Sequence, residues 1–129
     1  GEVGRLLASA ELLKQGFGVA RPESDDGYDL VSTSAAGRMC RLQVKTRSRG
    51  IVYGNGGEMF PVRRRRGAKK NEKSTEDREY RAWEIDAFVF VSLISGHCWV
   101  ISVDEIDLRK HFKSVSPGDR HDSAWHVLT

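Results

Sequence analysis

The chain has 129 residues, of which 39% are hydrophobic and 30% are charged, and its formal net charge is +3. This length and composition indicate one globular domain over residues 1–129 with a modest core, and they argue against disorder throughout the chain. No apolar run reaches the roughly 18 residues of a transmembrane helix, so no membrane partner is expected. The start of the chain carries no secretory signal pattern, and two cysteines make no disulfide framework, so we expect a cytoplasmic protein.

The first predicted element is a helix that stops at Gly16, a residue type favoured just after a helix C-terminus. Glu2 lies at the start of this helix. Apolar residues recur at the helical period and predict a single apolar face, typical of a helix packed on a core: Val3, Leu6, Leu7, Ala10 and Leu13. A short extended piece over 17–20 and a turn over 23–27 follow.

Two strands are predicted next, over 28–34 and 38–46, joined by a loop that ends in Gly37. Apolar and polar residues alternate along the second strand, which predicts one face in the core and one polar face. The apolar members are Cys40, Leu42 and Val44, and the polar members are Arg41, Gln43 and Lys45.

The second half of the chain is predicted to hold two longer strands, over 85–94 and 98–103. The first of them is nearly all apolar and should be a central strand buried on both faces. A short edge strand over 59–62, a helix over 104–112 capped by Asp104 and a last strand over 124–128 complete the expected elements. Trp125 should pack onto the core or at an interface. A helix, then strands, then a late helix fit a mixed α/β or α+β domain.

Positive charge is concentrated in one stretch, Arg41–Lys70, which we call the basic stripe. It holds ten Lys or Arg and one acid, Glu58, so it carries +9 and the other 99 residues carry −6. Such a stripe indicates a polyanionic partner such as nucleic acid, and the alternative is a solvated loop that keeps the protein soluble. We expect a mobile basic loop around 63–79. The residues predicted to contact DNA are Arg47, Arg49, Arg63, Arg64, Arg65, Arg66, Lys69 and Lys70.

The loop between the first two strands decides which residues face each other. If residues 35–37 form a three-residue loop, Asp29 lies opposite Gln43 on the same face of the strand pair. Lys45, two residues further along, points to that face as well. A four-residue loop would instead pair Asp29 with Leu42.

An acid, a side-chain amide and a lysine on one face suggest a particular chemistry. A carboxylate beside a carbonyl oxygen suits a hard cation such as Mg²⁺, and a neighbouring lysine can stabilise charge that develops on a phosphate. Together with the basic stripe, this set suggests metal-assisted hydrolysis of a phosphodiester. From the spacing alone, the solvated face of an ordinary hairpin explains the same three residues at least as simply.

Four segments, taken in order over roughly residues 1–103, resemble the PD-(D/E)XK nuclease superfamily. They are a first helix with Gly1-Glu2-Val3-Gly4 and Ala10-Glu11-Leu12-Leu13, then Gly27-Tyr28-Asp29-Leu30-Val31, then Leu42-Gln43-Val44-Lys45-Thr46, and a strand that follows Trp83-Glu84-Ile85-Asp86. The Gln-X-Lys form of the motif makes the chain most similar to the group I intron homing endonucleases of cyanobacterial type. It is also similar to the archaeal Holliday-junction resolvases.

The resemblance implies a restriction-endonuclease-like fold, with a central mixed β-sheet flanked by helices. It also implies a metal site in which Asp29, the side-chain oxygen of Gln43, the Val44 carbonyl and Glu2 bind Mg²⁺, for which Mn²⁺ could substitute. Lys45 would contact the scissile phosphate and the attacking water. Gln43 stands in place of the superfamily's second acid, so metal affinity should fall unless Glu2 compensates.

The expected function is that of a Mg²⁺-dependent endonuclease acting on double-stranded or branched DNA. A chain with one active site cuts both strands with two copies or two visits, so a homodimer or a homotetramer is expected. Two alternatives stay open. One is a nuclease like the Holliday-junction resolvases, and the other is a DNA-binding module that keeps the fold without cleavage, which Gln43 favours.

Overall fold

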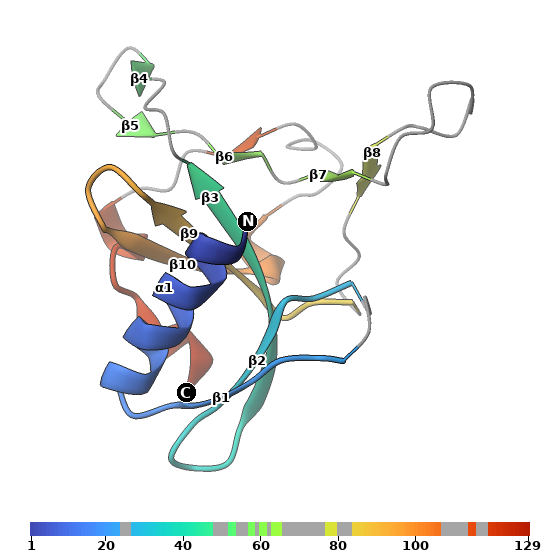
Figure 1. The fold of residues 1–129 in the computed structure, drawn as a ribbon, viewed down its shortest axis with the longest axis vertical. Coiled ribbons are helices and arrows are strands. Elements are labelled where there is room, and N and C mark those ends of the chain that lie inside the picture. The colour runs from blue at the N-terminus through green and yellow to red at the C-terminus, as the bar shows by residue number, and fades with distance from the viewer. Residues whose placement is uncertain are drawn as a thin grey trace.

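A computed structural model describes residues 1–23, 27–47, 84–106 and 119–129, together with the backbone of several short strands. A five-stranded sheet in the order β1-β2-β3-β9-β10 forms the centre, and α1 lies across one of its faces (Figure 1). The bounds are α1 (Glu2–Lys14), β1 (Gly18–Ala20), β2 (Leu30–Thr33), β3 (Met39–Arg47), β9 (Ala87–Ser92) and β10 (Cys98–Ser102). β3 and β9 run parallel and the other neighbours run antiparallel, so the sheet is mixed and the predicted α+β class is confirmed.

Three further antiparallel pairs of short strands are present. β4 (Val52–Tyr53) pairs with β5 (Gly57–Glu58), β6 (Phe60–Pro61) with β11 (Ser114–Val115), and β7 (Arg63–Arg65) with β8 (Asp77–Glu79). The expected short strand over 59–62 is therefore present as β6. The two ends of the predicted basic loop pair as β7 and β8, residues 66–76 lie outside the described residues, and the mobility of the loop stays a prediction.

Helix α1 is confirmed, but the face that it buries is not the predicted one. It turns Gly4, Ala8 and Leu12 toward the sheet. Among the residues predicted to form the apolar face, Val3, Leu6 and Leu13 are more than half exposed. The reason is a close approach that only a very small side chain allows, since a Cβ atom on Gly4 would overlap the methyl group of Thr46 on β3. The close approach at Gly4 therefore places the small side chains, together with Leu12, on the buried side.

The end of α1 follows the prediction for Gly16. Gly16 has a φ of +89°, a left-handed conformation that glycine adopts without strain. Its N–H donates to the Leu13 carbonyl at 3.1 Å, and the Phe17 N–H donates to the Leu12 carbonyl at 3.0 Å, the Schellman pattern. Leu12 and Phe17 both enter the core, so this cap returns the chain along the sheet as β1.

The sheet carries an apolar cluster on each face. The cluster on the α1 side contains Leu12, Leu42, Val44, Val89 and Trp125 among others, so Trp125 packs onto the core. The cluster on the opposite face includes Phe88 and Phe90, whose rings stack with centroids 5.6 Å apart. β9 lies between β3 and β10 with every residue buried, which confirms the predicted central strand in a shorter form.

Two C-terminal predictions are wrong, the last strand and the cap at Asp104. The last strand, over 124–128, is wrong, because Trp125–Leu128 is a 3-10 helix that buries Trp125 and Leu128 with a helical spacing instead of an alternating one. Of the helix predicted over 104–112, the described part is a 3-10 turn at Val103–Glu105. Its cap is Ser102, whose hydroxyl accepts the Asp104 N–H at 3.3 Å, and 107–112 lies outside the described residues. Within the described ranges, no helix has the length and apolar character to cross a membrane.

Candidate active site

Asp29 lies where β2 separates from β3. The pairing ends with Leu30 opposite Leu42, the register that the three-residue loop predicts, and Gly37 at φ +91° closes that loop. The Asp29 N–H then donates to the Leu42 carbonyl at 2.8 Å. Because β3 continues where β2 has ended, the Val44 N–H needs another acceptor, and Asp29 Oδ2 accepts it at 3.0 Å.

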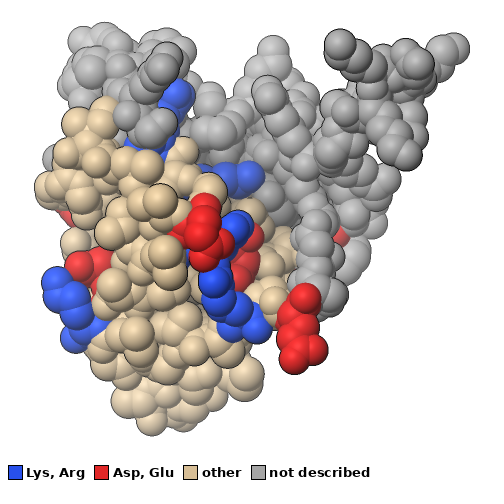
Figure 2. Space-filling model, viewed as in Figure 1, with Lys and Arg blue, Asp and Glu red and all other residues tan. Residues whose placement is uncertain are grey.

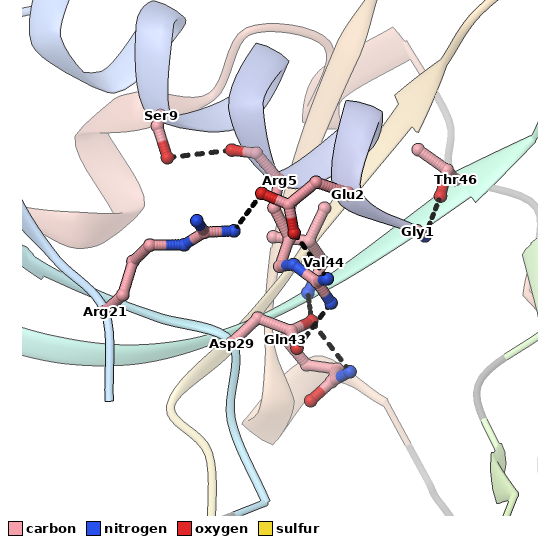
Figure 3. Close-up of polar contacts among 9 residues, drawn as sticks. All are labelled: Gly1, Glu2, Arg5, Ser9, Arg21, Asp29, Gln43, Val44 and Thr46. Carbon is pink, nitrogen blue, oxygen red and sulfur yellow. Dashed lines mark hydrogen bonds and ion pairs between the residues drawn. The ribbon is translucent and has the colours of Figure 1, made fainter. Parts of the chain in front are cut away.

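Gln43 is the second partner of the Asp29 carboxylate. Its Nε2 donates to Asp29 Oδ2 at 2.9 Å, so this one oxygen accepts two hydrogen bonds from β3 (Figure 3). The two side chains therefore face each other, as the predicted register requires. The amide holds the carboxylate through its nitrogen, and its oxygen would face a shared cation only after the amide turns over. The metal-binding role of Gln43 stays a prediction.

Lys45 follows Gln43 on the same half-buried face of β3. Its neighbour on the parallel strand β9 is Phe90, and the neighbour of Gln43 is Phe88, so the polar face borders the apolar cluster of that side. An apolar border lowers the local dielectric constant and strengthens the attraction of an ammonium group for a phosphate. The Val44 side chain points to the opposite, α1 side. The predicted roles of Lys45 and of the Val44 carbonyl stay predictions.

Glu2 reaches the same place from the start of α1. Gly4 packs against Thr46 of β3, and the backbone nitrogen of Gly1 donates to Thr46 Oγ1 at 3.0 Å. These two contacts hold the first turn of the helix against β3, the strand that carries Gln43 and Lys45. In Figure 3 Glu2 lies beside Arg5, whose guanidinium faces Asp29, and the metal-binding role of Glu2 stays a prediction.

Two arginines hold the Glu2 carboxylate. Arg5 Nη2 donates to Glu2 Oε2 at 2.7 Å, and Arg21 Nη2 donates to Glu2 Oε1 at 2.6 Å. Arg5 Nη1 also lies 3.6 Å from Asp29 Oδ1, so one guanidinium group stands between the two carboxylates. The hydrogen bond from Arg5, followed by that from Arg21, lowers the pKa of Glu2, and the bond to Glu2 raises the pKa of Arg5.

The two carboxylates suit a divalent cation. Glu2 Oε2 and Asp29 Oδ1 already face one positive group, Arg5, and converging carboxylate oxygens are the donors that Mg²⁺ and Mn²⁺ prefer. No group of three or more His, Cys, Asp or Glu in the described ranges is placed to hold a metal ion. A cation here would therefore use two carboxylates, an amide or backbone oxygen, and the water molecules that Mg²⁺ usually keeps.

Three contacts at or beside the site were not predicted from the sequence: Arg5 with Glu2, Arg21 with Glu2, and Arg41 with Asp86. The spacing of three residues between Glu2 and Arg5 on a helix is a signal that could have indicated their pair. Arg21 is 19 residues from Glu2, and only the tertiary structure brings them together. Asp86 Oδ2 accepts hydrogen bonds from the backbone N–H of Arg41 at 2.7 Å and from its Nε at 3.2 Å. These bonds connect the residue just before β9 to β3.

Half of the residues predicted to bind DNA lie outside the described part of the chain. Arg47 is half-buried at the end of β3, and the backbone of Arg63–Arg65 forms β7. Arg49, Arg66, Lys69 and Lys70 lie outside the described residues. On the face shown in Figure 2, acidic and basic side chains lie together over the start of α1, and most of the remaining surface over that helix carries neither.

The chain matches the family model of the PD-(D/E)XK endonucleases over residues 1–124, and it belongs to that family. Among solved structures it is similar to a bacterial homing endonuclease, I-Ssp6803I. The two share 23% sequence identity and a TM-score of 0.76, over 99% of this chain and 89% of that one. No curated protein sequence matches the chain significantly. The resemblance inferred from the motifs is thus confirmed, and the protein is a nuclease of the endonuclease type with the expected fold.

Proposed function

We propose that this protein is a metal-dependent DNA endonuclease that hydrolyses phosphodiester bonds, with Mg²⁺ as its cation and Mn²⁺ able to replace it. One observation carries the proposal. At the fork between β2 and β3, Asp29 and Gln43 meet face to face, and the start of α1 adds Glu2 to the same place. Lys45 lies on the same face of β3, so acids and a lysine are arranged for chemistry on a phosphate.

In the proposed hydrolysis, different residues of the chain have different roles. When bound, the divalent cation supplies a polarised phosphate oxygen and a more acidic water molecule. Asp29 would hold the cation through Oδ1, because Oδ2 is engaged by the Val44 N–H and by Gln43. Glu2 completes the anionic side of the site. Lys45 places a positive charge where negative charge develops on the phosphate.

The basic stripe supports double-stranded DNA as the substrate. Lysine and arginine attract the phosphate backbone without regard to sequence. β7 and β8 form a two-stranded antiparallel ribbon with Arg63–Arg65 in one strand, and ribbons of this kind fit the major groove of B-DNA. The likeness to a homing endonuclease supports DNA as the substrate.

The exposed side of α1 supports assembly of a homodimer, or of a homotetramer from two such dimers. Val3, Leu6, Ala10 and Leu13 follow the spacing of three and four residues typical of a helix that packs on another helix. Val3, Leu6 and Leu13 are 57%, 56% and 61% exposed. A two-fold pairing of α1 with α1 of a second copy would cover these exposed apolar side chains and provide one site for each DNA strand. We expect light scattering to give a dimer or larger, and Leu6→Glu to shift it toward the 14.5 kDa monomer.

Cleavage assays on linear duplex and four-way junctions, with Mg²⁺ or Mn²⁺, test the function. We expect Asp29→Ala to lose cleavage and to keep its affinity for DNA in EDTA, since the basic stripe supplies that attraction. Asp122→Ala, which removes an acid paired with His97, is the matched control. Cleavage by folded Asp29→Ala at the parent rate would overturn the assignment. Binding without cleavage by the parent would favour the non-catalytic module, and preference for junctions would favour the resolvase.

A further inference from the structure

The start of α1 places an arginine where the proposed function needs a metal ion. The Arg5 guanidinium lies 2.7 Å from Glu2 Oε2 and 3.6 Å from Asp29 Oδ1 (Figure 3). The other Asp29 oxygen, Oδ2, is engaged by strand β3 through the Val44 N–H and the Gln43 amide. A cation that binds both Asp29 Oδ1 and Glu2 must therefore enter the space that Arg5 now holds.

We propose that Arg5 is a positioning residue that acts as the counter-cation of the metal-free site and gives up this place when a divalent cation binds. The inference rests on the proposed metal-dependent function. Without metal, Arg5 keeps Glu2 and Asp29 directed at one centre, because two neighbouring carboxylates repel each other unless a positive charge lies between them. The same contact opposes metal binding, since Arg5 must release a charged hydrogen bond before Glu2 can turn to the new cation.

The geometry of Arg5 favours exchange over a permanent ion pair. Its 3.6 Å contact with Asp29 exceeds hydrogen-bond length, so this contact is the weaker of the two. The side chains of Arg5 and Glu2 are 32% and 52% exposed, so solvent reaches the ion pair and the guanidinium can turn outward into water. The backbone stays in place meanwhile, because Ser9 Oγ donates to the Arg5 carbonyl at 2.7 Å within the helix.

Arg21 offers a matched control within the same site. It carries the same charge as Arg5 and donates to the same carboxylate, at Glu2 Oε1. Among the described residues, its ion pair is with Glu2, whereas Arg5 bridges Glu2 and Asp29. A cation that joins Glu2 Oε2 to Asp29 displaces Arg5 and leaves Arg21 where it is. The two arginines should therefore differ in their effect on metal affinity.

Titration of the full chain with Mn²⁺, followed by the electron paramagnetic resonance signal of the free ion, tests this inference. We expect Arg5→Gln to bind Mn²⁺ about ten-fold more tightly than the parent, the effect of removing one opposing charged hydrogen bond. Arg21→Gln should change the affinity by less than about three-fold, as expected for an exposed ion pair. Arg5→Lys keeps the charge and should stay close to the parent.

Thermal unfolding gives a second readout that does not depend on activity. Arg5→Gln should be less stable than the parent without metal, because Glu2 and Asp29 then repel each other. It should gain more stability than the parent on addition of Mn²⁺, because tighter binding to the native state raises stability by mass action.

The outcomes separate this inference from the proposed function. Unchanged or weaker Mn²⁺ binding by Arg5→Gln, or equal tightening by Arg21→Gln, would overturn the role of Arg5 and leave metal dependence standing. If Arg5→Lys binds Mn²⁺ as much more tightly than the parent as Arg5→Gln does, the explanation by charge is wrong. Absence of Mn²⁺ binding in the parent and in every variant would overturn the metal-dependent function, and the role of Arg5 with it. Circular dichroism confirms that each variant is folded.

Discussion

Gln43 Nε2 lies 2.9 Å from Asp29 Oδ2, at the position where the resemblance to the superfamily leads one to expect a second acid. An amide can donate a hydrogen bond to this carboxylate, whereas an ionised acid can only accept one. A carboxylate at position 43 would repel Asp29 in the absence of metal. The amide therefore lets the strand fork hold its acid in place before any cation binds, at the cost of weaker attraction for that cation.

The substitution Gln43→Glu tests whether the amide stabilises the metal-free site at the expense of metal affinity. We expect Mn²⁺ affinity to rise, because the substitution adds a negative charge beside Asp29. Stability without metal should fall by about 1–3 kcal/mol, since Asp29 loses a charged hydrogen bond. Urea unfolding with and without Mn²⁺ measures both effects. Gln15→Glu adds the same charge at the exposed C-terminal end of α1, where the helix dipole makes it cost up to about 1 kcal/mol, and it should leave Mn²⁺ affinity unchanged. A Gln43→Glu protein insensitive to Mn²⁺ would contradict the placement of the site.

Lys45 is expected to serve the phosphate and not the metal. Lys45→Met keeps the length and apolar stem of the side chain, so it should fold normally beside Phe90. Cleavage should fall by about 100-fold or more, as when one preorganised stabilising group is removed from an active site. Mn²⁺ affinity should be unchanged or slightly higher, since an ammonium group is no ligand. Lys14→Met on α1 is the control, and a parallel loss of Mn²⁺ binding and cleavage would contradict this role.

Gly4 and Thr46 set how closely α1 approaches β3. Gly4→Ala adds a methyl group that overlaps Thr46 Cγ2, so we expect a net loss of about 1 kcal/mol or more, even though alanine is the better helix former. Thr46→Ser removes that methyl group and keeps the hydroxyl, so the double variant should recover most of the loss. Urea midpoints of the four proteins measure the coupling. A Gly4→Ala protein as stable as the parent would show that the approach is looser.

The pairing of Asp29 with Gln43 could be predicted because a short loop fixes the register of two adjacent strands. Once residues 35–37 form a three-residue loop, the partner of Asp29 follows from counting along the chain. The structure has this register as far as Leu30 opposite Leu42, and beyond that pair Gln43 meets Asp29 through a hydrogen bond between their side chains. Glu2 could be placed only through the family resemblance, because its contact with the site depends on how α1 lies on the sheet. The bridge made by Arg5 depends on that same tertiary placement.

The buried face of α1 could not be read from hydrophobicity. Val3, Leu6 and Leu13 are the more apolar set, yet Gly4 and Ala8 face the sheet together with Leu12. Small side chains allow a helix to approach a strand closely, and a pattern of apolar residues does not encode that distance. The prediction of a strand over 124–128 is wrong for a related reason, since a five-residue segment with four apolar residues fits either period.

Asp86 should give the protein a measurable loss of stability in acid. Burial opposes the charged form of Asp86, but the hydrogen bonds from Arg41 outweigh this effect and lower the pKa of the carboxyl group. A lowered pKa in the native state means that Asp86 stabilises the fold above its ordinary pKa of 3.8, and that this contribution is lost as the pH falls through the native value. Urea unfolding of the parent and of Asp86→Asn, from neutral pH to below pH 3.8, should show a smaller loss for the variant, and equal losses would contradict the role of this carboxyl group.

The basic stripe should act on DNA through charge. We expect replacement of Arg63, Arg64, Arg65 and Arg66 by Ala to weaken binding to unrelated duplexes about equally. Each lost phosphate contact should flatten the dependence of log affinity on log salt concentration by roughly 0.9. Fluorescence anisotropy in EDTA at several salt concentrations measures the slope without cleavage. Arg120→Ala removes an exposed arginine paired with Glu105 and should leave the slope unchanged. An unchanged slope in the fourfold variant would mean that these arginines do not touch DNA, and a loss confined to one sequence would indicate contacts to base edges instead.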